Sequence, residues 1–554
     1  MKQWKYLLGL LLIFVTISGC GGGGGKKSTT GTVTGMLTLG STVDAARIGG
    51  KTNQVKFAGQ GSFPKVSFRR SQLTTSSIAN EKIVKLRPGL SEVQAQQVIM
   101  ALGATIKRKI YGPTNMYVIK TDSTSAQSSD FTNNTDIVYV QNNHIFYAQD
   151  TTVTPNDTDY SEYQSWNYTM LNLPKAWSIQ KGNSNVVVAV IDSGVATSHP
   201  DLMSNLVSGY DFVSNDSDPS DNTYYNGKNR YSHGTHVAGI ISAVTNNGLG
   251  VAGVGWNVKI MPVRVLENDG SGSEDAIISG IQWAVDHGAN IINLSIGGEF
   301  TAAQASQALK DALQNALNNN VTIVAAAGNE GHYVDFPANY PGVIAVSAVD
   351  ANGRLTSYSN YGSEIWVGAP GGDANRDDIT SYVYSLSYDK LSQANGYIGM
   401  AGTSMACPHI SGLAALLYSR GVKTPSKIRE RLKTNSTGFN IQTGYGVPDA
   451  FLTLLGTAKV FYVLADGTCG TMKDARVGSS YSVSRIPPGQ AYVCAFVDTD
   501  ADGQVSTGDL FAFKGLTSTA GVVTTQDLTL EKVTISPAKP ISVYISEYIK
   551  AGFQ

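Results

Sequence analysis

The chain has 554 residues, which is more than one hydrophobic core accommodates and predicts three or four units at roughly 150 residues each. Hydrophobic residues make up 42% and charged residues 15%, a composition typical of a folded globular protein and not of a disordered one. The formal net charge is −1 and no Lys/Arg-rich block is present, so nucleic acid is not expected as a partner.

The N-terminus, MKQWKYLLGLLLIFVTISGC, has the pattern of an export signal. Lys2 and Lys5 precede an apolar stretch of about a dozen residues, too short to span a bilayer and as long as a signal peptide. The stretch ends in ISGC, which resembles a bacterial lipobox. Residues 1–19 are therefore predicted to be a lipoprotein signal peptide, and Cys20 to carry a membrane-anchoring lipid. A plain secretory signal is the alternative. Both predict export, to the cell envelope or outer membrane or into the medium.

Residues 20–80 begin with a run of glycines and stay rich in small polar residues, which predicts a flexible tether with at most one short strand pair. Residues 81–150 differ, because EKIVKLRPG alternates like a strand and LSEVQAQQVIMALGA has helical spacing. TIKRKIYGPTNMYVIKTD then indicates a hairpin and DIVYVQNNHIFYAQD a last strand. These patterns predict a small α+β domain, followed by a polar linker at residues 151–163.

Residues 164–458 alternate strands with helices. VVVAVID, KIMPVRVL, NIINLSI, VTIVAAAG and VIAVSAV are continuous apolar runs, typical of strands buried on both faces, and helical patterns lie between them. The predicted fold class is α/β, with a doubly wound, mostly parallel sheet. In such a sheet the functional site lies at the C-terminal ends of the strands.

Residues 459–554 alternate apolar and polar positions between turn residues, which predicts an all-β domain, a sandwich. The chain has four cysteines, of which Cys469 and Cys494 fall in this domain. In an exported protein these two are predicted to form a disulfide. Two buried free thiols are the alternative.

Three side chains at strand or helix boundaries form a candidate catalytic set. Asp192 ends the strand VVVAVID, His233 opens the helix HGTHVAGII, and Ser404 opens the helix before ISGLAALL. In a nucleophilic relay the hydroxyl attacks, the imidazole takes its proton, and the carboxylate holds the imidazole. Pro408 is predicted to lie in the first helical turn. Backbone N–H groups there have no acceptor within the helix, so proline, which lacks an N–H, is tolerated.

The segments DSGVATSHPDL, HGTHVAGII, NLSIGG, AAAGNEG and GTSMACPH resemble the signatures of subtilisin-like serine peptidases and occur in family order. The resemblance implies a serine endopeptidase that acts on protein or peptide substrates through an acyl-enzyme, with Asp192, His233 and Ser404 as triad. Asn329 of AAAGNEG is the implied side-chain donor to the oxyanion, beside the free N–H groups of the helix at Ser404. A catalytically inactive surface-anchored binding protein is the alternative. An acid-acting Ser-Glu-Asp peptidase would have Glu in place of His233.

Further residues follow from the resemblance. His236, His199 and His409 are interpreted as core histidines and not as metal ligands. Asp335 is placed near the base of the S1 pocket, where its charge would favour Lys or Arg at P1, against an aromatic or aliphatic P1. The residues implied to bind substrate are Ser295, Ile296, Gly297, Gly270, Gly272, Ala326, Ala327, Gly328 and Asp335.

Two calcium sites are predicted. TNNGLGVAG resembles the calcium loop of the family, with Asn247 and Asp201 as side-chain ligands and Gln164 as a further candidate. DTDADGQVSTGD matches an EF-hand-type loop, except that its last position is Asp instead of Glu; its carboxylates are Asp498, Asp500, Asp502 and Asp509. A solvated acidic turn is the alternative for the second loop.

Residues 81–150 resemble the family's N-terminal propeptide, which assists folding and then occupies the cleft until it is cleaved. The resemblance therefore implies a self-processing zymogen that is cut between about Asp150 and Asp159 and inhibited by its own propeptide. We expect a monomer, held at a membrane through Cys20 if that residue is lipidated.

Overall fold

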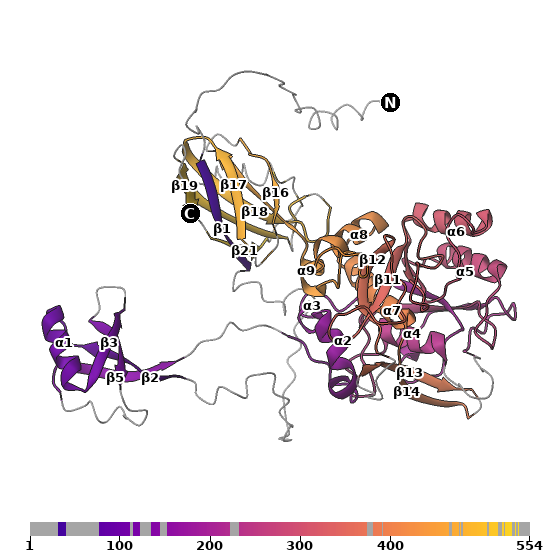
Figure 1. The fold of residues 1–554 in the computed structure, drawn as a ribbon, viewed down its shortest axis with the longest axis horizontal. Coiled ribbons are helices and arrows are strands. Elements are labelled where there is room, and N and C mark those ends of the chain that lie inside the picture. Colours follow the sequence, from indigo (N-terminus) through magenta and orange to yellow (C-terminus); the bar gives the residue numbers. More distant parts are fainter. Residues whose placement is uncertain are drawn as a thin grey trace, which may run out of the picture. The chain divides into compact units, whose positions relative to one another are not determined.

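The structure is a computed structural model (Figure 1). It describes residues 31–39, 77–110, 115–121, 134–144, 152–221, 232–373, 381–390, 392–464, 468–475, 477, 480–502, 504–506, 509–518, 523–525, 527–533, 538 and 541. The predicted signal peptide and Cys20 lie outside these residues. Contacts divide the chain into two compact units, Lys51–Asp150 and the remainder.

A seven-stranded sheet, parallel throughout, forms the centre of the larger unit, in the order β12-β11-β10-β9-β6-β8-β7. This order confirms the predicted doubly wound fold. The sequence patterns did not indicate β7 and β12. The strands are β6 (Val187–Asp192), β7 (Tyr210–Asp211), β8 (Lys259–Arg264), β9 (Ile291–Leu294), β10 (Thr322–Ala326), β11 (Ile344–Val349) and β12 (Ile365–Pro370).

Helices cover both faces of this sheet, and the alternation along β6 shows how. Val188 and Val190 pack into the cluster that contains α4 (His233–Ser242) and α7 (Thr403–Ser419), whereas Ala189 and Ile191 pack with α5 (Glu274–Asp286) and α6 (Gln307–Asn318). Every β6 residue from Val188 to Asp192 is buried, as expected of a strand covered on both faces. The same unit contains η4 (Tyr160–Gln164), α2 (Ser165–Met170), α3 (Leu173–Ala176), η5 (Met203–Asn205), α8 (Pro425–Thr434), α9 (Ala450–Leu455) and the hairpin of β13 (Val383–Asp389) and β14 (Ala394–Met400).

Helix α7 corrects the expectation for Pro408. The helix begins at Thr403, so Pro408 lies in its second turn, where a backbone N–H would normally bond the carbonyl of Ser404. Proline has no such N–H. The Ser295 hydroxyl donates to that carbonyl instead, at 2.9 Å, so the oxygen that proline leaves without a partner is satisfied.

The smaller unit has the predicted α+β composition. Its antiparallel sheet has the order β3-β4-β2-β5, and one helix follows β2. The elements are β2 (Ser77–Leu86), α1 (Glu92–Ala101), β3 (Ala104–Lys109), β4 (Met116–Thr121) and β5 (Ile137–His144). The first strand begins at Ser77, within the segment predicted to be a tether.

The C-terminal residues form an all-β region in which the strands follow one hydrogen-bonded path, β16-β15-β18-β19-β21-β1-β17, with β20 beside β1. Strand β1 (Gly31–Leu39) comes from the predicted tether and is visible in Figure 1 as an indigo strand among orange and yellow ones. The tether prediction is therefore wrong for these residues. The other strands are β15 (Ala458–Leu464), β16 (Lys473–Ala475), β17 (Ser480–Ile486), β18 (Gly489–Val497), β19 (Leu510–Ser518), β20 (Val523–Thr525) and β21 (Leu528–Lys532).

Cys469 and Cys494 do not form the predicted disulfide. Cys494 pairs with Phe461 on one side of β15, and Cys469 pairs with Val463 on the other side. Two strand spacings of about 4.8 Å separate their backbones. That separation exceeds the roughly 7 Å over which a disulfide can join two Cα atoms.

The predicted linker at residues 151–163 is also wrong from Thr152 onward, since this segment packs into the larger unit. The N–H of Val153 donates to the Pro174 carbonyl at 2.7 Å, and that of Asp159 donates to the Gly250 carbonyl at 2.8 Å. Tyr160 is buried at the start of η4. Among the described residues, no helix is long and apolar enough to cross a bilayer.

Candidate active site

Asp192 and His233 are in direct contact at the carboxyl edge of the sheet. His233 Nδ1 donates to Asp192 Oδ1 at 2.8 Å, and the N–H of Ser193 donates to the same oxygen at 2.7 Å. Asp192 is fully buried, and its Oδ2 has no hydrogen-bond partner among the residues that the structure describes. Gly234 permits this close approach, because a Cβ there would lie 2.2 Å from the Gly194 carbonyl oxygen.

The electrostatics of this pair favour a basic imidazole. Burial lowers the pKa of His233, but the charge of Asp192 and the hydrogen bond to it outweigh that effect, so the pKa is raised above its ordinary value. The buried carboxylate of Asp221 adds a smaller effect in the same direction. Asp221 itself accepts hydrogen bonds from Ser193 Oγ at 3.3 Å and Thr235 Oγ1 at 2.8 Å.

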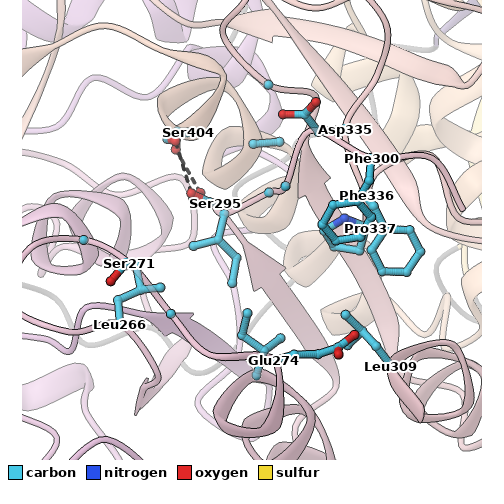
Figure 2. Close-up of a pocket in the computed structure, with 18 of the residues that line it drawn as sticks. Leu266, Ser271, Glu274, Ser295, Phe300, Leu309, Asp335, Phe336, Pro337 and Ser404 are labelled. Carbon is cyan, nitrogen blue, oxygen red and sulfur yellow. Dashed lines mark hydrogen bonds between the residues drawn. The ribbon is translucent and has the colours of Figure 1, made fainter. Parts of the chain in front are cut away.

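Ser404 lies in the first turn of α7 and lines the same cavity as His233. Its hydroxyl donates to the carbonyl oxygen of Ser295 at 3.1 Å, the contact drawn as a dashed line in Figure 2. The Ser295 hydroxyl donates in return to the Ser404 carbonyl. Two reciprocal bonds therefore fix the backbone that carries the serine.

A buried polar network supports this arrangement from behind. Asn293 Nδ2 donates to Ser295 Oγ at 3.0 Å, and Asn293 Oδ1 accepts from Ser411 Oγ at 2.8 Å and from Cys407 Sγ at 3.3 Å. Burial raises the pKa of the Cys407 thiol to about 12, so this cysteine stays protonated and acts as a donor. The network connects strand β9 to helix α7.

Asn329 follows β10 and faces the start of α7. Its Oδ1 accepts from the Thr403 N–H at 2.8 Å and from Thr403 Oγ1 at 3.0 Å. Because both donors belong to Thr403, the amide oxygen of Asn329 faces Thr403. The amino group of Asn329 has no hydrogen bond among the described residues. Asn329 and Ser404 line one cavity, where that amino group is available to an anionic oxygen.

The cavity has a volume of about 850 Å³. It is lined by most of the residues predicted to bind substrate: Gly270, Gly272, Ser295, Ile296, Gly297, Ala326, Gly328 and Asp335. Ala327 does not line it. The Ala327 methyl group is buried in the core cluster that also contains Val334 and Phe336.

Asp335 lies at one end of this cavity in Figure 2, with Ser271 and Leu266 at the other. It is 4% exposed, and Gly328 leaves room for it, because a Cβ there would lie 2.4 Å from Asp335 Oδ2. Burial, followed by the charge of Glu330, raises the pKa of Asp335 to about 6. Glu330 also lines the cavity, so this end contains two carboxylates.

The first predicted calcium site brings Asp201 and Asn247 into contact, since Asn247 Nδ2 donates to Asp201 Oδ1 at 2.7 Å. Asp157 is a further buried carboxylate here and accepts from the N–H groups of Asn246 and Asn247. Burial raises the pKa of both carboxyls, that of Asp201 to about 7, and their mutual repulsion adds to the rise at Asp201. Asn247 Oδ1 itself accepts from the Leu249 N–H at 2.8 Å. The side-chain oxygens here that fit a hard divalent cation are therefore those of the buried carboxylates Asp157 and Asp201.

Gln164 does not complete that donor set. Its Oε1 accepts from the Ala252 N–H at 2.7 Å, and its amide nitrogen donates to the carbonyls of Ala252 and Tyr384. The side chain therefore fastens the loop after α4 to η4. Both ends of its amide are already used within the protein.

The second predicted site is only partly assembled. Ligand oxygens of Asp498, Asp500 and Asp502 lie within 4.8 Å of one another. Asp509 stays apart from them, because its oxygens accept from the N–H groups of Thr499 and Ser506, both at 2.8 Å. Its short side chain closes the loop and does not reach the cluster.

The three remaining predicted core histidines are buried. His236 Nε2 bonds the Ile398 carbonyl at 3.1 Å, His199 Nε2 bonds that of Gly396, and His409 Nδ1 bonds that of Met405. Burial lowers the pKa of His236 to about 3 and of His409 to about 4, so both stay neutral. The interpretation as core residues fits this environment.

Four side chains near the site were not predicted from the sequence. Asp221 supports Ser193, Asp157 joins the loop predicted to bind calcium, Glu330 shares the cavity with Asp335, and Asn293 holds Ser295. Glu330 was detectable, since it directly follows Asn329 in AAAGNEG. Asp157 and Asp221 stand in polar stretches without local periodicity.

A serine at a helix N-terminus, an Asp-bound imidazole and an amide donor at the carboxyl edge of a parallel sheet are the parts of a serine hydrolase. The subtilase family model matches residues 183–448. A thermophilic serine proteinase of a Bacillus species is 40% identical over 348 residues, which are 62% of this chain and 79% of that protein. This chain belongs to the subtilase family and is a subtilisin-like serine endopeptidase.

Other comparisons agree with this assignment. Thermitase of Thermoactinomyces vulgaris is 40% identical over 284 residues, 51% of this chain and 91% of that protein. A protease structure from Pseudoalteromonas arctica superimposes with a TM-score of 0.50 at 37% identity. The superposition covers 54% of this chain and 98% of that one, so the subtilisin-like fold accounts for about half of the present sequence.

Proposed function

We propose that this endopeptidase works through an acyl-enzyme on Ser404, with His233 as general base and then general acid. Asp192 holds the Nδ1–H tautomer and stabilises the imidazolium. The observation that carries the proposal is the 2.8 Å bond from the His233 imidazole to the fully buried carboxylate of Asp192, since His233 lines the same cavity as Ser404.

In the first step, the Ser404 hydroxyl exchanges the Ser295 carbonyl for His233 Nε2 and attacks the substrate carbonyl. The oxyanion is stabilised by the Ser404 N–H, which has no intrahelical acceptor, and by the amino group of Asn329. His233 then gives its proton to the leaving amine, and water repeats the sequence on the ester.

The test is covalent labelling by an organophosphate probe. The wild-type chain should gain one probe mass on the peptide that contains Ser404, and the Ser404→Ala chain should gain none. An inactive binding protein on the same scaffold would remain unlabelled in both forms, and that result would reject the proposal.

Asn329→Ala is expected to lower kcat about 10²- to 10³-fold with little change in KM, because the amide contributes mainly to the transition state. Since Asn329 Oδ1 also holds Thr403, Asn329→Asp is the informative companion: it keeps an acceptor for Thr403 but lacks the amino donor. Steady-state kinetics on a peptide amide should show a comparable loss for both variants. A large loss in Asn329→Ala alone would assign the residue a purely structural role.

For substrate choice we propose that Asp335, together with Glu330, selects Lys or Arg at P1. Asp335 is buried and lines the cavity. In such a partly desolvated place its negative charge would attract the positive charge of a Lys or Arg side chain. Extended peptide backbone would pair with residues 295–297 on one side and 270–272 on the other, as in strand addition.

Asp335→Asn is expected to reduce the preference for P1 Arg over P1 Leu in kcat/KM by tenfold to a hundredfold, roughly one charge-assisted hydrogen bond. The wild-type preference should rise with pH through about 6, as Asp335 ionises, and the variant should lack that rise. Paired peptide substrates assayed from pH 5 to 8 measure this. Asp269→Asn, at an exposed carboxylate that also lines the cavity, is the matched control. An unchanged ratio in Asp335→Asn would reject the assignment.

We also propose that the chain is an exported, self-processing zymogen whose propeptide is the unit Lys51–Asp150. Because Val153 and the residues after it bond the catalytic fold, the cut is proposed to fall before Val153, at the early end of the range predicted from the sequence. Lipidation at Cys20 and a monomeric enzyme remain parts of this proposal.

Calcium is proposed as a structural ligand of the loop that contains Asp157, Asp201 and Asn247. The bound ion would neutralise two buried carboxylates and fasten residues 156–159 to residues 246–250, which already share hydrogen bonds. The cluster of Asp498, Asp500 and Asp502 is proposed as a weaker second site, since Asp509 is engaged elsewhere.

The calcium dependence of stability should grow with pH. The pKa of Asp201 is raised to about 7, so in metal-free protein its ionisation opposes folding, and the unfolding free energy falls between about pH 4 and 7. Calcium binds the ionised form and should add about 2.7 kcal/mol at a hundredfold excess over Kd. Thermal melts of the Ser404→Ala chain in CaCl₂ and in EDTA should therefore differ more at pH 8 than at pH 5. Asp201→Asn should remove most of that difference, whereas an equal difference at both pH values would contradict the proposal.

A further inference from the structure

Strand β1 belongs to the mature part of the enzyme although it precedes the propeptide in the chain. The larger compact unit consists of Met1–Gly50 and Thr151–Gln554, and the unit between them is the one proposed to be removed. A cut before Val153 therefore separates β1 covalently from every strand with which it pairs.

The position of β1 is internal to its sheet. Gly31–Met36 pair antiparallel with β17, and the other edge of β1 pairs parallel with β20 at Thr32–Thr34 and with β21 at Leu37–Leu39. The Met36 N–H also bonds Asp527 Oδ1 at 2.9 Å. Both edges of the strand are used, unlike those of a peptide added at a sheet margin.

Strand β17 depends on β1 for its place. In the described part of the chain, β17 has no ladder other than the one to β1, so the path from β21 to β17 passes through β1. Removal of β1 would expose the backbone groups of β17 and one edge each of β20 and β21. Unpaired strand edges of this kind are prone to aggregation.

The side chains of β1 also fill the core of this region. Val33 is 1% exposed and Leu37 is fully buried, and both belong to the cluster that contains Val483 and Ile486 of β17 and Leu528 and Leu530 of β21. Met36, on the opposite face of β1, is 42% exposed. The strand thus has one inward and one outward face, which allows a matched test.

We propose that β1 remains bound as a non-covalent strand after processing, so that the mature enzyme is a two-chain complex. This rests on the proposed zymogen function and requires two cuts, one between Leu39 and Ser77 and one before Val153. Each hydrolysis adds one water across a peptide bond and leaves a new carboxylate and a new amine. Whatever the chain carries ahead of Gly31, including a lipid on Cys20, then stays with the enzyme after the propeptide is lost. The main-chain hydrogen bonds to β17, β20 and β21 would hold β1 in place, as they hold a peptide that is added to a sheet as a strand.

The test uses the full chain with Ser404→Ala, so that it does not depend on self-processing. Recognition sites for a sequence-specific protease are introduced between residues 50 and 76 and between residues 145 and 151, and both are cut. In native gel filtration the N-terminal fragment should coelute with the large fragment, and in urea the two should separate. Elution of the N-terminal fragment on its own in native buffer would overturn the proposal, whereas loss of self-processing in the active chain would count only against the zymogen function.

Variants and a peptide sharpen the result. The double variant Val33→Asp with Leu37→Asp should release the N-terminal fragment after cutting, and Met36→Asp should not. Equal retention of the fragment by the double variant and by Met36→Asp would contradict the pairing. As a second measurement, a Ser404→Ala chain that begins at Ser77 is refolded with a synthetic peptide of residues 29–41. The peptide should be retained at one per chain and raise the soluble yield severalfold, and a scrambled peptide should do neither. Equal yields with no bound peptide would overturn the proposal.

Discussion

Ser404→Ala is expected to lower kcat about 10⁶-fold, the loss that removal of the nucleophile causes in subtilisin, a relative of this protein. Without the hydroxyl, the Asp192–His233 pair has no proton to take, and only oxyanion stabilisation and substrate binding remain. Turnover of a fluorogenic peptide amide measures the loss. The mass of the purified chain measures processing, which should stop at the full-length form in the variant only.

Ser419→Ala is the matched control for this experiment. It makes the same chemical change on the same helix, where the Ser419 hydroxyl donates to the Ala415 carbonyl at 2.8 Å, within the helix itself. Turnover and processing should stay within about twofold of wild type, as for most partly exposed substitutions. Comparable activity in the Ser404→Ala and wild-type chains would show that another residue is the nucleophile.

The elements that could be predicted from the sequence are those that local pattern determines. The apolar run VVVAVID is buried on both faces, and α6 carries the apolar spacing expected of a helix packed on a sheet. Asp192, His233 and Ser404 could be proposed because they stand at the end of a strand or at helix starts, and Asn329 because its segment resembles a subtilisin-like signature. Their neighbours in the motifs are small residues, such as Gly234, that leave space for these contacts.

The features that could not be predicted depend on partners far away in the chain. Strand β1 is a short segment between glycine-rich and polar stretches, and its pairing partners follow more than 400 residues later. Asp157 lies beside the loop proposed to bind calcium only because the fold brings it to residues 246–250. The spacing of Cys469 and Cys494 gave no information that β15 lies between them.

The two hydrogen bonds between Ser404 and Ser295 could not be predicted from the sequence either. The sequence contains both serines and Pro408, but nothing in their spacing indicates that Ser295 replaces the donor that proline lacks. A buried carbonyl without a partner costs about 1–3 kcal/mol. The substitution of a side-chain hydroxyl for a backbone N–H therefore permits a proline one turn after the nucleophile, where the helix is packed against β9.

Asp192→Asn is expected to lower kcat about 10⁴-fold at pH 8, because the amide can hold the imidazole in the wrong tautomer and cannot stabilise the imidazolium. The variant should also change the pH dependence. The wild-type pKa of His233 is raised mainly by the charge of Asp192, and the imidazole must be neutral to act as base, so activity is lost as pH falls through that raised pKa. Removal of the charge should move the acid limb of kcat/KM to lower pH.

Asp221→Asn separates the effect of charge from that of contact. Asp221 raises the pKa of His233 through space, but its hydrogen bonds go to Ser193 and Thr235 and not to the imidazole. Its removal should move the acid limb in the same direction by a smaller amount and leave kcat at pH 8 far less affected. An acid limb that stays in place in Asp192→Asn would mean that another group controls it, because a buried carboxylate 2.8 Å from an imidazole cannot lose its charge without changing that imidazole's proton affinity.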